Sequence, residues 1–239
     1  MLFLFRVILM AEIKYSNEEL LKICKDYQKR NKFSVGFDKM TPKAAETWLS
    51  VNGDELCRKL NSGKYIVQPA TGFNVAKSDG RYRSLAGLTI IDCIIQKCVC
   101  EKLSETCENV FSDFSFAYRP GRSTGDALKA FCTYASSDYF AAKIDIKSFF
   151  DSINHEVLEK ALYKVLSDRK TVSLLMSFAK MPVIIDGSFT ERNEGLLQML
   201  FYPFWMKIKT LSDITIVIRK VLKPLCIKGL RASKNSRNA

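Results

Sequence analysis

Residues 143–155 read KIDIKSFFDSINH, and the prediction of the fold begins with this segment. Ala141–Ile146 is typical of a short strand in which Ile144 and Ile146 share one face and Asp145 points to the other. A tight turn follows, and Asn154 is placed to cap a helix, so the strand would end with a carboxylate at the lip of a sheet. Carboxylate oxygens suit Mg²⁺, although the same pattern also fits a solvated aspartate beside a core pair of phenylalanines.

Working outward, capping and periodicity signals predict helices on both sides of this stretch. Ser16 and Glu19 have the spacing of a capping box, and Thr41-Pro42 supplies an N-cap and a first helical residue. Ser78-Asp79-Gly80 is typical of a turn that joins two strands into a hairpin. The predicted helices begin near residues 16 and 41 and cover about 55–60, 92–107, 127–134, 154–166 and 172–179, and the predicted hairpin covers 64–75 and 81–85.

Val183–Ile185 is also predicted to be a strand, paired with Ala141–Ile146. Helices beside a small sheet indicate the α+β class.

The charge of the chain is basic and uneven. The formal net charge is +12, from 37 Lys/Arg against 25 Asp/Glu. Residues 199–239 hold nine bases and a single acid, Asp213. Such a surplus indicates a polyanionic partner, either nucleic acid or an anionic membrane face. A merely basic soluble protein would also fit the charge taken alone.

Eight cysteines and one histidine do not form a recognisable metal-binding pattern. No Cys-x-x-Cys pair occurs, and His155 lies far in sequence from the cysteines at 93–107. Most cysteines fall at apolar helical positions, so we expect reduced core thiols in a cytoplasmic protein. The apolar residues 1–10 are too short to span a bilayer. We interpret them as an over-extended start, with a weak anchor or signal remnant as the alternative.

Six segments, in one order, resemble the successive blocks of group II intron reverse transcriptases and their bacterial relatives. The resemblance covers roughly residues 36–198 and implies a right-hand polymerase fragment, with helical fingers, a β-hairpin and a partial palm sheet. Besides the stretch around Asp145, the segments are VGFDKMT (35–41), GKYIVQP (63–69), AKSDGRYRSLAGLTIIDCIIQKCV (76–99), FSDFSFAYRPGRSTGDAL (111–128) and GSFTERNEGLLQ (187–198).

The resemblance implies a catalytic role for Asp145, as the first Mg²⁺-binding aspartate of the palm. It implies that Phe150 packs under the sugar and rejects a ribose 2′-OH. Three further residues are implied to contact the incoming nucleotide. Lys77 and Arg83 belong to the predicted hairpin at 64–85, and Gln198 begins the motif that follows the hairpin of the palm.

Template binding is implied for Arg119 and Arg122, because their block resembles the template edge of the fingers. Phosphate contacts of this kind position nucleic acid without reading its sequence.

The resemblance ends at Gln198. There the family continues with Gly, Ser-Pro and a helix leading to Tyr-x-Asp-Asp, whereas this chain continues MLFYPFWMKIKTLSDITIVIRK (199–220). No Asp-Asp pair occurs anywhere in the sequence. We interpret residues 199–239 as a non-homologous basic tail produced by frameshift or truncation, with a divergent genuine C-terminus as the alternative. Two-metal catalysis needs carboxylates on both sides of the metal pair, so we expect this chain alone to be catalytically incomplete.

The expected organisation is a doubtful N-terminal extension at 1–10, fingers at 11–135, partial palm at 136–198 and the tail at 199–239. The expected function is that of an RNA-directed DNA polymerase. Its partners would be an RNA template, a DNA primer and deoxynucleoside triphosphates, with no stable membrane association and no signal for an oligomer. A non-catalytic nucleic-acid-binding remnant is the main alternative, and a membrane-peripheral protein is a third.

Overall fold

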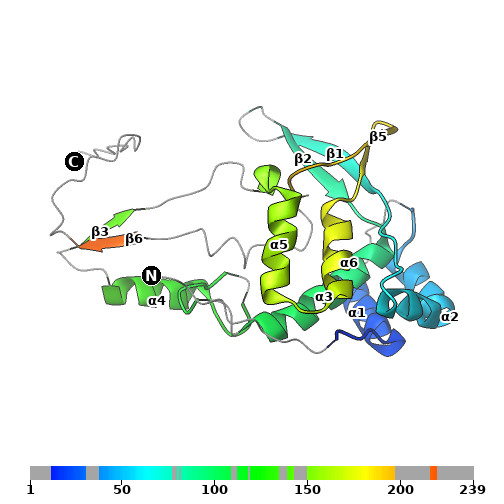
Figure 1. Cartoon of the computed structure of the whole chain (residues 1–239), viewed down its shortest axis with the longest axis horizontal. Helices are drawn as coiled ribbons and strands as arrows, with labels where there is room; N and C mark the ends of the chain where they lie inside the picture. Colours follow the sequence, from blue (N-terminus) through cyan, green and yellow to red (C-terminus); the bar gives the residue numbers. More distant parts are fainter. Residues whose placement is uncertain are drawn as a thin grey trace.

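A computed structural model describes residues 12–30, 38–76, 80, 82–108, 112–117, 119–134, 139–142, 150–196 and 216–219. The fold is α+β, as the sequence predicts, with helices packed beside a small sheet (Figure 1). The helices are α1 (Asn17–Arg30), α2 (Pro42–Asn61), α3 (Ile90–Cys107), α4 (Thr124–Tyr134), η2 (Phe150–Ser152), α5 (His155–Val165) and α6 (Arg169–Ala179). The strands are β1 (Ala70–Ala76), β2 (Tyr82–Gly87), β3 (Tyr139–Ala142), β4 (Val183–Ile185), β5 (Ser188–Thr190) and β6 (Ile216–Arg219).

Helix α1 begins at the predicted capping box. The backbone N–H of Glu19 donates to Ser16 Oγ at 3.3 Å, and the N–H of Ser16 donates to Glu19 Oε2 at 3.2 Å. The two bonds satisfy amide groups that a helix start otherwise leaves unpaired. The other oxygen of the Glu19 carboxylate, Oε1, accepts from Lys102 Nζ at 2.6 Å, so the same residue also ties α1 to α3.

Helix α2 corrects one prediction, because it is continuous where the sequence indicated two short helices. Thr41 caps it through a bond from the Ala44 N–H, and Gly63 follows its end with a φ of +71°. Gly53 lies in its middle, between the start of the first predicted helix and the second predicted helix at 55–60. A Cβ at position 53 would lie 1.8 Å from Asn17 Oδ1, so glycine permits α1 and α2 to approach closely there.

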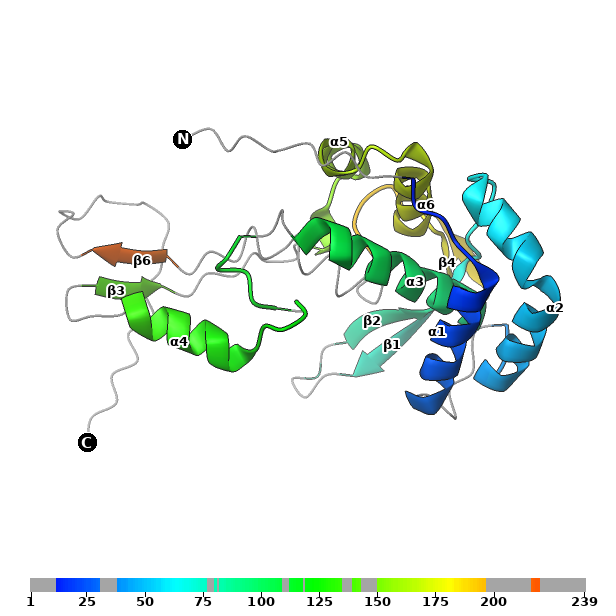
Figure 2. The same cartoon turned by 90° about the horizontal axis from the view of Figure 1, so that it is seen from below.

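Helix α3 forms the centre of the core. Ile91, Ile95, Val99 and Leu103 are buried along one face of this helix. Ile90 and Ile94, beside that face, are buried as well. A helix that is apolar on several sides is one that is covered on several sides. Helices α1 and α2 both pack against it, and Figure 2 shows the β1–β2 hairpin below it.

The main sheet has the strand order β2-β1-β4-β5. Strands β1 and β2 form the predicted antiparallel hairpin, with Thr71 opposite Gly87 and Ala76 opposite Tyr82. Strand β4 lies parallel to β1 on its other side, with Ala70 opposite Val183.

The predicted partner of Val183–Ile185 is wrong. This strand, β4, pairs with β1 and β5, and not with the strand that precedes Asp145. The physical reason is the two-residue turn Asp186-Gly187, whose φ values are +48° and +79°. Two positive φ angles in succession are what a tight hairpin requires, so the chain reverses at once and Ile185 faces Ser188.

Strand β3 lies at Tyr139–Ala142, earlier than the predicted 141–146, and residues 143–149 lie outside the described part of the chain. It pairs antiparallel with β6 in a separate two-stranded sheet. One segment of the basic tail therefore has a strand partner. Figures 1 and 2 show this sheet and α4 at the opposite end of the long axis from α1, α2 and α3.

Candidate active site and nucleic-acid-binding residues

The β1–β2 hairpin carries two of the residues predicted to bind nucleotide. Arg83 lies in β2, where its backbone is opposite Val75 and one pair from the end of the ladder. Lys77 follows β1 directly and lies outside the described residues, as do Asp145 and Gln198. The described residues therefore do not test whether these four side chains lie around one nucleotide-binding site.

Phe150, the predicted sugar contact, is held by the segment that contains Gly195. The carbonyl of Phe150 accepts from the Leu196 N–H at 2.7 Å, and the carbonyl of Ile153 accepts from the Gly195 N–H at 2.7 Å. The Phe150 side chain is half-buried and packs against the core. Two blocks far apart in sequence, 143–155 and 187–198, are thus joined directly at this residue.

Gly195 permits this close contact, and the sequence reading did not single it out. Its φ is +76°, in the left-handed region that favours glycine, and a Cβ there would lie 2.7 Å from the backbone oxygen of Asp151. The carbonyl of Gly195 lies 2.8 Å from His155 Nε2, and His155 is buried. His155 is the first residue of α5, so this contact joins the start of that helix to the Gly195 segment.

Arg192 is a second residue of this region that the sequence reading missed. Burial lowers the pKa of its guanidinium, and the nearby Asp151 carboxylate opposes that shift. Its Nη2 would lie 2.9 Å from a Cβ on residue 195, so this cation rests against the Gly195 turn. No spacing in the sequence would have identified it, because its charged neighbour, Asp151, lies far away in the sequence.

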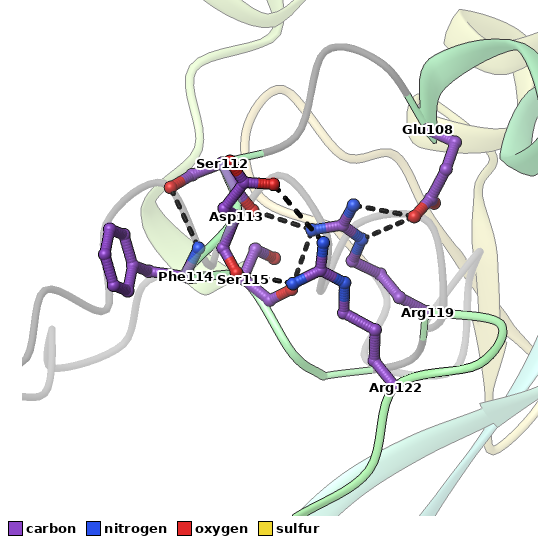
Figure 3. Close-up of polar contacts among 7 residues, drawn as sticks. All are labelled: Glu108, Ser112, Asp113, Phe114, Ser115, Arg119 and Arg122. Carbon is purple, nitrogen blue, oxygen red and sulfur yellow. Dashed lines mark hydrogen bonds and ion pairs between the residues drawn. The ribbon is translucent and has the colours of Figure 1, made fainter. Parts of the chain in front are cut away.

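Arg119, predicted to bind template, is buried. Its side chain is 3% exposed, and Nε and Nη2 both contact Glu108 Oε1, at 2.8 and 2.6 Å. Its Nη1 donates to the carbonyls of Ser112 and Ser115 at 2.6 and 2.8 Å (Figure 3). In this geometry Arg119 fixes the loop 112–117 to the end of α3 and does not present its charge to solvent.

Arg122 lies beside that buried arginine and is more accessible. Its Nη1 donates to the carbonyl of Asp113 at 2.5 Å, and its guanidinium lies 5.6 Å from the centre of the Phe116 ring. The loop 112–117, which precedes both arginines, also exposes an aromatic side chain. Phe114 in this loop is 62% exposed, and Figure 3 shows its ring pointing away from Arg119 and Arg122. An arginine and an exposed ring on one ordered loop are the components of a single-stranded nucleic acid contact.

Six described cysteines are free thiols, of which Cys132 is exposed, Cys93 is half-buried and the other four are buried. Burial raises the pKa of Cys93 and Cys98 to about 12, so these thiols stay protonated and are poor metal ligands or nucleophiles. Among the described residues no three His, Cys, Asp or Glu side chains gather as a metal site. Within the same residues, no helix has the length and apolar character needed to cross a bilayer.

Known proteins resemble this chain in sequence over most of its length. Residues 75–203 match the family described as "Reverse transcriptase (RNA-dependent DNA polymerase)". Protein YkfC of Escherichia coli (strain K12) is 27% identical over 168 residues, which cover 68% of this chain and 44% of that protein. The group II intron-encoded protein LtrA of Lactococcus lactis subsp. cremoris is 31% identical over 145 residues, which cover 60% of this chain and 24% of that protein. The chain thus spans less than half the length of these relatives.

A solved structure shows the same fold. The chain aligns with part of a partial Cas6-RT-Cas1–Cas2 complex with a TM-score of 0.51 and 21% identity, over 82% of this chain and 34% of that one. All seven predicted site residues, from Lys77 to Gln198, lie inside the segment 75–203.

Proposed function

The chain belongs to the reverse transcriptase (RNA-dependent DNA polymerase) family, and from that premise we propose that it binds an RNA template, a DNA primer and deoxynucleoside triphosphates. The observation that carries this proposal is the extent of the family match, which includes every residue assigned a role by resemblance. In this proposal Lys77, Arg83 and Gln198 contact the nucleotide, Phe150 lies under its sugar, and Asp145 is the metal-binding aspartate. We propose a cytoplasmic location, which the reduced thiols support.

We propose Arg122 as the template contact on the fingers edge, in preference to Arg119. Arg119 has its guanidinium committed to Glu108 and two backbone carbonyls, whereas the partner of Arg122 is the exposed Asp113. Releasing an exposed ion pair costs about 1 kcal/mol or less, so Arg122 can exchange Asp113 for a phosphate.

A primer–template binding measurement tests this assignment. The probe is a fluorescein-labelled DNA primer annealed to RNA, and the readout is anisotropy as salt is raised. Arg122→Gln should weaken binding and reduce the salt slope by about one, as expected for the loss of one phosphate contact. Lys129→Gln is the matched control, because Lys129 has the same charge and lies on α4 with its side chain 84% exposed. Equal effects of the two variants would mean that general charge accounts for binding.

The residues present do not fit the two metal ions of the family mechanism. Two Mg²⁺ ions need carboxylates on both sides of the pair, and this chain offers Asp145 without an Asp-Asp motif. We therefore propose that the chain by itself binds its substrates without joining them. Under this proposal the chain alone is a non-catalytic nucleic-acid-binding member of the reverse transcriptase family.

A second candidate, a complete catalytic site, is favoured by one observation. Strand β6 of the tail pairs with β3 so that Ala142 lies opposite Ile216. Asp145 follows Ala142 by three residues and Asp213 precedes Ile216 by three residues in the sequence, and neither aspartate is among the described residues. Two carboxylates there would supply the missing ligand, so Asp213→Asn is the variant that separates the two candidates.

A further inference from the structure

The carboxylate of Asp92 is completely buried and accepts three hydrogen bonds. Its Oδ1 accepts from the Tyr65 hydroxyl at 2.9 Å. Its Oδ2 accepts from the Thr89 hydroxyl at 2.7 Å and from the Gln68 backbone N–H at 3.3 Å. Asp92 is 0% exposed, and burial raises the pKa of its carboxyl while these three bonds oppose the shift.

These donors lie at the two roots of the β1–β2 hairpin. Gln68 stands two residues before β1, and Thr89 stands two residues after β2. Thr89 is also the N-cap of α3, and its Oγ1 accepts from the Asp92 N–H at 3.1 Å. In an ordinary capping box the third helical residue bonds back to its own cap. Here that side chain accepts from the hydroxyl of its cap, Thr89, and also from Gln68 and Tyr65, so it joins both ends of the hairpin to the first turn of the central helix.

Strand β4 also attaches to the hairpin close to its roots. Strand β4 pairs with β1 only at Ala70 and Thr71, and the Ala70 N–H donates to the Pro182 carbonyl at 3.0 Å. The side chains of Val183 and Ile185 lie against Gly72, and from Thr71 to Ala76 strand β1 pairs with β2. The direction of the hairpin is therefore set near its roots.

We propose that Asp92 is a positioning residue that fixes the β1–β2 hairpin to α3 and so sets where Lys77 and Arg83 stand. The inference rests on the nucleotide-binding role proposed for those two residues. The arm from Ala70 to Ala76 is about 20 Å long at the usual rise of a strand, so a rotation of about 5° at the root moves its end by about 2 Å.

The chemistry of the contact predicts which substitutions preserve it. Asparagine can place its oxygen where Oδ2 accepts from Thr89 and Gln68, and the Tyr65 hydroxyl can turn to accept from the amide. Alanine removes every acceptor and leaves buried donors unpaired. Loss of such partners shifts a local opening equilibrium by about tenfold or more.

Hydrogen exchange of the full chain tests the proposal by region. In Asp92→Ala we expect amides of β1 and β2 to exchange about tenfold faster than in the wild type, with α1 and α2 nearly unchanged. In Asp92→Asn we expect exchange within about threefold of the wild type. Thr41→Ala is the control, because it removes the cap of α2 and should increase exchange there instead. Binding of a fluorescent deoxyadenosine triphosphate should weaken in the alanine variant and recover in the asparagine variant.

Two results would overturn the proposal. One is hairpin exchange that does not change in Asp92→Ala, and the other is an equal increase in the hairpin and in α1 and α2. If the alanine variant does not fold, Tyr65→Phe decides, since it removes one donor without a cavity and should still loosen the hairpin alone. If the wild type binds no triphosphate, the nucleotide role fails, while the exchange pattern still decides whether Asp92 holds the hairpin.

Discussion

Replacing Arg119 with alanine should destabilise the chain far more than replacing its neighbour Arg122. The Arg119 guanidinium is nearly inaccessible and joins Glu108 to the carbonyls of Ser112 and Ser115. Removing one partner of a buried ion pair typically costs about 3–5 kcal/mol, because the other charge loses its compensation. The Glu108 side chain is 35% exposed and can be partly hydrated, so we expect a loss at the lower limit, about 3 kcal/mol.

Urea unfolding followed by circular dichroism measures this loss. Arg122→Ala is the control in the same loop, and its pair with the exposed Asp113 should contribute about 1 kcal/mol or less. A double-mutant cycle with Glu108→Gln isolates the coupling, which should exceed about 1 kcal/mol for residues in direct contact. The reasoning is wrong if the two arginine variants lose the same stability, or if Arg119 and Glu108 act additively.

Three further outcomes follow from the same geometry. Gly195→Ala should cost about 1–3 kcal/mol in urea unfolding, because its φ of +76° and the Asp151 backbone both oppose a Cβ, whereas an unchanged midpoint would contradict this. Burial raises the folded-state pKa of Asp92 above its unfolded value, so the folded chain binds more protons between the two values and loses stability as pH rises through that interval. Asp92→Asn should remove this loss, so its urea midpoint relative to wild type should increase from about pH 4 to about pH 7. Truncation after Gln198 removes nine bases and one acid and should weaken RNA binding at low salt, and unchanged affinity would make the charge of the tail incidental.

Local signals in the sequence predicted local structure well. The capping boxes and caps at Ser16, Thr41 and Asn154 lie where helices begin. The turn around Gly80 separates the two strands of the hairpin, as predicted. Each of these features is decided by residues within a few positions of one another, so the sequence contains the information directly.

Non-local contacts account for the misses. The role of Gly53 inside α2 is to leave room for Asn17 of another helix, and the partner of β4 is β1, more than a hundred residues earlier. The burial of Arg119 depends on Glu108, eleven residues away, on the preceding helix. From the sequence alone, an arginine in a segment that resembles the template edge is expected to be exposed. Its burial can be predicted only when its acidic partner is known. The Asp92 network had a partial signal, since Thr89 and Asp92 have capping spacing, but its bonds to Tyr65 and Gln68 arise only in the fold.

The proposed function is that this chain binds the substrates of a reverse transcriptase without joining them. The most direct measurement is Mg²⁺-dependent extension of a labelled DNA primer on an RNA template, using the full chain and its Asp145→Asn and Asp213→Asn variants. We expect the wild type to bind the primer–template but to extend it no more than the Asp145→Asn variant does. Extension by the wild type that is lost in both variants would contradict it and would identify Asp213 as the second carboxylate of a complete site.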